Sequence, residues 1–137
     1  MLIVFAGLPG TGKSTIARAL AVELAAVWLR IDTLEQAIRT SGVVDGDVKD
    51  LGYRAAHAVA EDNLRLGRTV IGDSVNPWML TRNAWRDAGL RAGVRVVEIA
   101  RENAPSAQAQ RFKEGSFLDA DRGRIASPGM LLENFRR

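Results

Sequence analysis

The stretch that decides the fold of this chain is GLPGTGKST at residues 7–15, directly after the apolar run MLIVFA at residues 1–6. Its first eight residues match the pattern G-x-x-x-x-G-K-[ST] in full, and an apolar helical repeat of Ile16, Leu20 and Leu24 follows. Glycines in this order allow positive φ angles that turn several backbone N–H groups toward one anion. A buried strand, this loop and an amphipathic helix together predict a phosphate-binding loop rather than a chance glycine-containing turn.

The loop also predicts individual contacts. Lys13 is expected to reach the β- and γ-phosphates of a nucleotide, and the Ser14 hydroxyl is expected to ligate Mg²⁺. The N-terminus of the following helix adds its dipole at the same point. The residues predicted to bind the nucleotide are Gly7, Leu8, Pro9, Gly10, Thr11, Gly12, Lys13, Ser14 and Thr15.

Strand and helix patterns alternate along the first hundred residues. Further strands are expected at residues 27–31 (VWLRI), 69–73 (TVIGD) and 94–99 (VRVVEI). Between them we expect a short helix at 34–39 and a longer one at 48–66, and a third from Asn76-Pro77 to near Gly93. This alternation predicts an α/β fold: a three-layer P-loop NTPase architecture with a mostly parallel sheet.

The sequence also predicts which side chains of the helix at 48–66 and which aromatic residues are buried. The apolar face of the helix at 48–66 is expected to carry Val48, Leu51, Ala55, Val59 and Leu66. The three tryptophans, Trp28, Trp78 and Trp85, are expected to fill the core, and the lone His57 to be a packed or partly exposed residue.

Two aspartates follow predicted strands. Asp32 ends the strand at 27–31 and Asp73 ends the strand at 69–73, so both should face the ligand crevice at the carboxyl ends of the strands. Phosphoryl transfer needs a carboxylate that accepts the proton of the attacking hydroxyl, a role that suits Asp32. Asp73 suits the binding of Mg²⁺. The alternatives are that Asp32 or Thr33 caps the next helix, and that Asp73 is a solvated turn residue.

Length and composition exclude several classes of protein. The chain has 137 residues and no Cys, which is enough for one domain at residues 1–137 and excludes disulfides and thiolate metal sites. No apolar run is long enough to span a bilayer, and no signal peptide is evident, so the expected compartment is the cytoplasm. A net charge of +3 without a basic, aromatic-interleaved run makes nucleic acid an unexpected partner.

The last third of the chain is less regular. From about residue 101 the periodicity is weak, and we expect at most one or two short helices in this irregular C-terminal segment, residues 101–137.

The motifs GLPGTGKST, IDT at residues 31–33 and GDSVNP at residues 72–77 resemble those of P-loop small-substrate kinases. This group includes chloramphenicol phosphotransferase, gluconate kinase, adenylyl-sulfate kinase, zeta toxins and polynucleotide kinase. The resemblance covers Met1 to about Ala100. It implies that Asp32 is the catalytic base, and that Asp73, Ser74 and Asn76 line the metal and acceptor pocket.

Such kinases carry an Arg-rich lid and a fifth strand after strand four. Here only Arg101 and Arg111 are candidates for lid arginines, and no fifth strand is predicted, so the C-terminal strand and lid are expected to be missing.

The sequence therefore predicts a phosphotransferase that uses ATP and Mg²⁺ to phosphorylate a hydroxyl of a small-molecule or nucleotide-like acceptor. Lys13 would neutralise the β- and γ-phosphates, Asp32 would orient and deprotonate the acceptor hydroxyl, and Arg101 or Arg111 would cover the transferred group. Ser14 and Asp73 would hold the metal. The alternatives are a nucleotide-binding protein with little or no transfer activity and a polynucleotide 5′-hydroxyl kinase. An NTPase that activates water is disfavoured because Ser74, not glutamate, follows Asp73.

Overall fold

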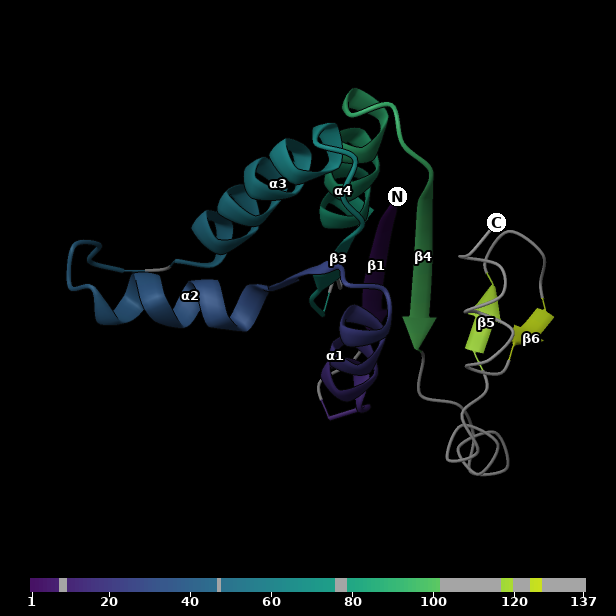
Figure 1. Ribbon diagram of the computed structural model, residues 1–137. Coiled ribbons are helices and arrows are strands. Elements are labelled where there is room, and N and C mark those ends of the chain that lie inside the picture. Colours follow the sequence, from purple (N-terminus) through teal and green to yellow (C-terminus); the bar gives the residue numbers. More distant parts are fainter. Residues whose placement is uncertain (8–9, 47, 76–78, 102–116, 120–123, 127–137) are drawn as a thin grey trace.

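Four parallel strands form a central sheet in the order β2-β3-β1-β4 (Figure 1). The computed structural model describes residues 1–7, 10–46, 48–75, 79–101, 117–119 and 124–126. In chain order the elements are β1 (Leu2–Gly7), α1 (Lys13–Glu23), β2 (Val27–Arg30), α2 (Ile31–Thr40), α3 (Lys49–Arg65), β3 (Val70–Asp73), α4 (Met79–Arg91), β4 (Val96–Arg101), β5 (Phe117–Asp119) and β6 (Arg124–Ala126). The predicted α/β fold with a parallel sheet is confirmed.

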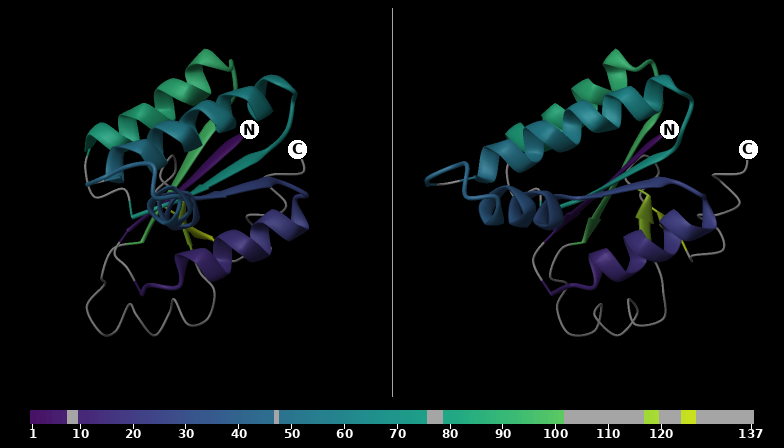
Figure 2. Two further views of the ribbon diagram at one scale, coloured as in Figure 1. Left: turned by 90° about the vertical axis from the view of Figure 1, so that its left-hand side faces the viewer. Right: turned by 60° about the vertical axis from the view of Figure 1, so that its left-hand side comes forward.

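Helices cover both faces of the sheet, which gives three layers (Figure 2). Alternate residues of β1 point to opposite faces: Ile3 and Phe5 pack with α1, whereas Leu2 and Val4 pack with α3 and α4. All four of these side chains are at most 2% exposed. The continuous apolar run at the N-terminus is therefore a central strand buried on both faces, as its sequence predicts.

The prediction for the buried face of α3 is wrong for three of its five residues. Val48, just before the helix, is buried as predicted and Ala55 is half-buried, but Leu51, Val59 and Leu66 are exposed. The face that packs against the sheet contains mainly small residues, with Ala56 and Ala60 completely buried. They lie one helical position away from the predicted stripe, beside Gly52 and Leu64. Small side chains let a helix approach a sheet closely, and a search for large apolar residues overlooks such a face.

α2 begins earlier than predicted. The expected helix at 34–39 extends over Ile31–Thr40 and starts immediately after β2, without a loop. Ile31 is 2% exposed and packs in the same cluster as the buried face of α3, which anchors the first turn. Beyond that turn α2 runs away from the sheet and lies against α3 (Figure 1).

The last third of the chain contains two strands that the sequence does not predict, whereas the prediction of at most one or two short helices falls on residues outside the described ones. Residues 117–119 and 124–126 are strands that pair antiparallel, with Leu118 opposite Ile125. β5 contacts β4, but within the described residues no fifth strand is hydrogen-bonded into the parallel sheet. Strands as short as three residues are too brief to show an alternating pattern, so the sequence does not reveal them.

In the described part of the chain, no helix is both long and apolar enough to cross a membrane.

Ion pairs attach α4 to its two neighbours. Glu61 of α3 pairs with Arg65 on its own helix and, at 2.9 Å, with Arg91 at the end of α4. The hydrogen bond from Arg91 is the main reason why the pKa of Glu61 is lowered from its ordinary value.

A second glutamate connects α4 to β4. Glu98 of β4 accepts a hydrogen bond from Arg86 of α4 at 3.0 Å, and it forms an ion pair with Arg82 of the same helix, also at 3.0 Å.

Gly72, in the middle of β3, provides space for the fully buried ring of Trp85. A Cβ at Gly72 would lie 2.9 Å from two atoms of that ring. We therefore expect Gly72→Ala to lower the free energy of unfolding by about 1–3 kcal/mol, measured by urea denaturation. Adding Trp85→Phe should recover part of the loss, because the phenyl ring lacks the crowded atoms.

Gly52→Ala is the matched control for this prediction. Its Cβ would lie 2.5 Å from Cγ of Glu35, so that half-buried side chain must shift, but Glu35 is not enclosed in the core as the ring of Trp85 is. Alanine also favours a helix over glycine by about 1 kcal/mol. Equal losses in the two variants would contradict the assignment of the Gly72 effect to the tryptophan.

His57 lies on α3 with its ring edge-on to Trp85, the ring centroids being 4.4 Å apart. Burial is the main cause that lowers its pKa, and Arg91 adds to it against the opposing effect of Asp50. The folded chain therefore binds fewer protons at this site than the unfolded chain. Stability should fall as the pH drops below about 6.5, the ordinary pKa of histidine.

The measurement is the free energy of unfolding between about pH 8 and about pH 5. We expect the decrease at low pH to be smaller in His57→Gln. An identical pH profile in this variant would show that other groups cause the decrease.

Candidate functional site

A cavity of about 410 Å³ opens at the carboxyl ends of the parallel strands. This is where open α/β sheets bind ligands, and the volume lies in the range typical of small-molecule sites. The residues that line it come from the loop after β1, the start of α1 and the ends of β2 and β3. They are Gly10, Gly12, Lys13, Ser14, Thr15, Arg30, Asp32, Asp73, Ser74 and Val75.

The loop between β1 and α1 has the positive φ angles that its glycines predict. Gly10 has φ 76° and Gly12 has φ 78°, a conformation that glycine adopts without strain. The backbone N–H of Gly7 donates to the carbonyl oxygen of Val75 at 3.0 Å, which joins the start of the loop to the segment after β3. Leu8 and Pro9, also predicted to bind the nucleotide, lie outside the described residues.

Lys13 is the first residue of α1, and its side chain is only 7% exposed. Its Nζ donates to Thr11 Oγ1 at 3.3 Å, so the ammonium group lies over the loop rather than in solvent. Ser14 and Thr15 follow in the same turn and also line the cavity. The first turn of α1 contains no acidic residue, so the helix dipole presents an uncompensated positive end to this site.

Asp73 is buried, with 3% of its surface exposed, at the end of β3. The alternative interpretation, a solvated turn residue, is therefore wrong. Its Oδ2 accepts a hydrogen bond from Trp28 Nε1 at 3.3 Å. Trp28 packs against the core on the α1 face, as predicted, but its polar atom reaches this carboxylate. The sequence contains no local signal for that contact, since the two residues are far apart along the chain.

Asp32 is the second residue of α2 and lines the cavity. Neither Asp32 nor Thr33 caps the helix: the cap position is Arg30, and no side chain caps the backbone there. Both capping interpretations are wrong because the helix begins at the buried Ile31. The Asp32 side chain is 71% exposed, and its Oδ2 lies 3.7 Å from Arg30 Nη2.

Sequence reasoning overlooked Arg30 as a residue of the site. A charged residue at the end of a predicted strand, on the edge where ligands bind, was the available signal. Its guanidinium places a positive charge beside Asp32 and inside the cavity lining.

The donor set of the cavity fits a hard divalent cation. Ser14 offers a hydroxyl and Asp73 a carboxylate, both oxygen ligands of the kind that Mg²⁺ prefers. Ser74 is 5% exposed, and its Oγ has no hydrogen-bond partner among the described residues, so one more oxygen is available. Over the same residues, no cluster of three or more His, Asp or Glu side chains could hold a metal alone. Mg²⁺ is typically bound by one or two carboxylates together with substrate phosphates, and Asp73 is a carboxylate of this kind.

Of the two predicted lid arginines, Arg101 lies among the described residues and Arg111 does not. The backbone of Arg101 ends β4 and pairs in register with Gly7, the first residue of the phosphate loop. Arg111 lies outside the described residues, as do Asn76 and Trp78.

Comparison with known proteins identifies the same architecture. The model of a family described as "AAA domain" matches residues 2–126. An uncharacterized protein of Mycobacterium tuberculosis is 34% identical over 99 residues, which cover 69% of this chain and 20% of the relative. The chain thus spans about a fifth of the length of the curated relatives that it matches.

Solved structures with this fold include two small-substrate kinases. The APS kinase CysC of Mycobacterium tuberculosis, in complex with AMPPNP and APS, has a TM-score of 0.62 and 23% identity; the match covers 80% of this chain and 66% of that one. A gluconokinase from Sinorhizobium meliloti has a TM-score of 0.52 and 19% identity, covering 98% of this chain and 72% of that one. At these identities the likeness concerns the fold alone, and this fold agrees with the one that the motifs indicate.

Proposed function

The chain belongs to the AAA domain family, and from this premise we propose that it binds ATP with Mg²⁺ and transfers the γ-phosphate to a hydroxyl group of a small-molecule or nucleotide-like acceptor. One observation carries the proposal. Lys13, Ser14, Asp32 and Asp73 line a single cavity at the carboxyl end of the sheet, although they come from three separate segments of the chain.

At the nucleotide end of the cavity, the chain neutralises phosphate charge. The Lys13 ammonium and the N–H groups of the loop and of the first turn of α1 would bind the β- and γ-phosphates. Ser14 and Asp73 would hold Mg²⁺, which when bound neutralises the charge that develops on the transferred group. Positioning and charge neutralisation account for most of the catalysis in such reactions.

At the acceptor end, Asp32 would accept the proton of the attacking hydroxyl. Its exposed carboxylate at the edge of the cavity is accessible to an incoming molecule, and its Oδ2 lies 3.7 Å from Arg30 Nη2. Arg101 and Arg111 would cover the transferred phosphate. Ser74, beside Asp73, has no basic group to activate water, which favours transfer to an acceptor over hydrolysis.

The test is a transfer assay with ATP that carries a label on its γ-phosphate. The acceptor panel should contain sugars, sugar acids, nucleosides, adenylyl sulfate, amino alcohols and an oligonucleotide with a free 5′-hydroxyl. Label that moves to an acceptor only when Mg²⁺ is present would support the proposal. Binding of Mg²⁺ and ATP by calorimetry without transfer to any acceptor would favour a nucleotide-binding protein instead.

A further inference from the structure

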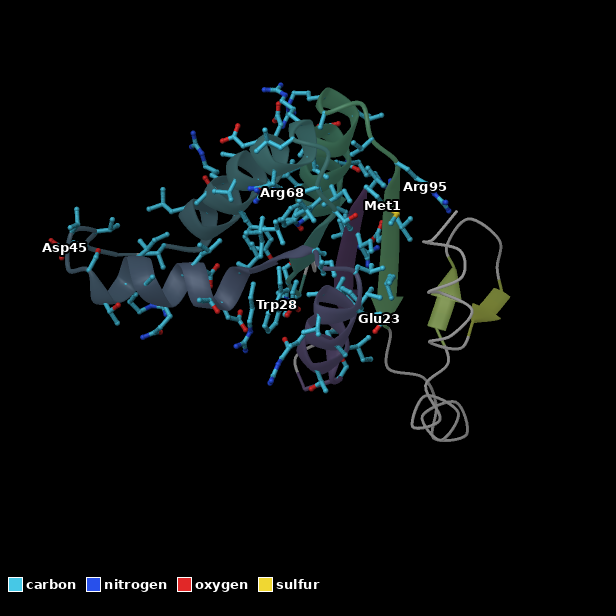
Figure 3. The ribbon with its side chains drawn as sticks, in the orientation of Figure 1. Met1, Glu23, Trp28, Asp45, Arg68 and Arg95 are labelled. Atoms are coloured by element: carbon cyan, nitrogen blue, oxygen red, sulfur yellow. The ribbon has the colours of Figure 1, made fainter. Side chains whose placement is uncertain are left out.

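Trp28 contacts one residue of the cavity lining, Asp73, from the neighbouring strand. Trp28 lies in β2 and pairs in register with Ile71 of β3, so Asp73 lies two residues further along the same face of the sheet. The ring of Trp28 packs beside α1 with the core residues of that face (Figure 3). From this position its Nε1 donates to Asp73 Oδ2 at 3.3 Å.

This contact restricts a carboxylate that has little else to hold it. Among the residues that the structure describes, Asp73 makes no other hydrogen bond or ion pair to a side chain. An aspartate at the end of a strand can rotate about two side-chain torsions, and a metal ligand must keep one orientation to bind well. A single donor on one oxygen selects that orientation and leaves the second oxygen for a cation.

We propose that Trp28 is a positioning residue for Mg²⁺: its indole N–H holds Oδ2 of Asp73, so that the other carboxylate oxygen is available to the metal that accompanies the nucleotide. This inference rests on the proposed function, because it assumes that Asp73 helps to bind the metal. The role is distinct from packing, since a phenyl ring could fill most of the same space without donating a hydrogen bond.

The experiment compares the affinity for ATP measured with Mg²⁺ and with a chelator, by calorimetry, in the unchanged chain and in Trp28→Phe. We expect the gain in affinity that Mg²⁺ provides to fall by about 10-fold, a typical effect of removing a group that orients a metal ligand. The affinity without metal should stay the same, because the phosphate loop is untouched.

Trp85→Phe is the matched control. It also removes an indole, but one that is fully buried under β3 and whose Nε1 has no hydrogen-bond partner in the described part of the chain. This variant should lose stability and keep the full gain in ATP affinity from Mg²⁺.

A second measurement follows the indole N–H resonance of Trp28 by NMR in the ATP-bound chain. Adding Mg²⁺ should shift it, and Asp73→Asn should remove that response.

The outcomes separate the two proposals. If Trp28→Phe keeps the full gain in ATP affinity that Mg²⁺ provides, the positioning role is overturned and the proposed function is not. If Trp28→Phe loses the same amount of ATP affinity with and without the metal, the positioning role is also overturned, in favour of a packing role. If the unchanged chain binds ATP no better with Mg²⁺ than without it, the metal site of the proposed function fails, and this result appears before any substitution is made.

Discussion

Lys13→Ala is expected to weaken the binding of Mg²⁺ and ATP by about 100-fold, which corresponds to about 3 kcal/mol of binding free energy. Lys13 is 7% exposed and lies over the phosphate loop, so its ammonium would form charge-assisted hydrogen bonds in a poorly solvated site. Alanine at this position leaves the phosphates without their main cation. The measurement is calorimetry with purified chain, with and without the substitution.

Arg18→Ala is the matched control for Lys13→Ala. Arg18 lies in the same helix, carries the same charge and is exposed, but it does not line the cavity. Its removal should leave the affinity unchanged, which separates a local contact from a general effect of net charge. Lys13→Ala should also keep its thermal stability, since it removes a buried charge. If the affinity of this stable variant equals that of the unchanged chain, the assignment of the phosphate loop is wrong.

Asp32→Asn is expected to lower the rate of phosphoryl transfer by at least about 100-fold, with the affinity for ATP unchanged. The amide has nearly the same shape as the carboxylate but cannot accept the proton of the acceptor hydroxyl. Because the Asp32 side chain is 71% exposed, the substitution should have little effect on folding. The turnover number is measured with whichever acceptor of the panel supports the fastest transfer.

Asp45→Asn makes the same chemical change outside the cavity. Asp45 is exposed beyond the end of α2, lies far from Trp28 (Figure 3) and does not line the cavity. It should transfer phosphate at the rate of the unchanged chain. Normal turnover by Asp32→Asn would mean that Asp32 is not the base, and that its charge serves the ion pair with Arg30.

Much of the fold could be predicted because its signals are local. The strand, loop and helix of residues 1–24 are adjacent in sequence, and the two following strands are short apolar runs whose predicted positions agree with the structure to within a residue. The buried face of α3 could not be predicted in the same way. Its contacts with the sheet select small residues, Ala56 and Ala60, and only the three-dimensional neighbours explain this choice.

The candidate site also contains some features that the sequence predicts and others that only the three-dimensional structure reveals. That Asp32 and Asp73 share one cavity follows from the rule that parallel strands carry ligands at their carboxyl ends, and it was predicted. The hydrogen bond between Trp28 and Asp73 depends on the register between β2 and β3. Register is a property of paired strands, so one strand's sequence does not contain it.

The paired arginines around Glu61 and Glu98 have a consequence for how this chain tolerates mutation. Each glutamate has two cationic partners, and for each at least one partner comes from α4. Loss of any single arginine leaves the carboxylate still neutralised, whereas loss of the glutamate leaves two like charges side by side. The junction between α4 and its neighbours is therefore redundant on its basic side and vulnerable on its acidic side. Among natural variants, we expect these arginines to drift more freely than the two glutamates.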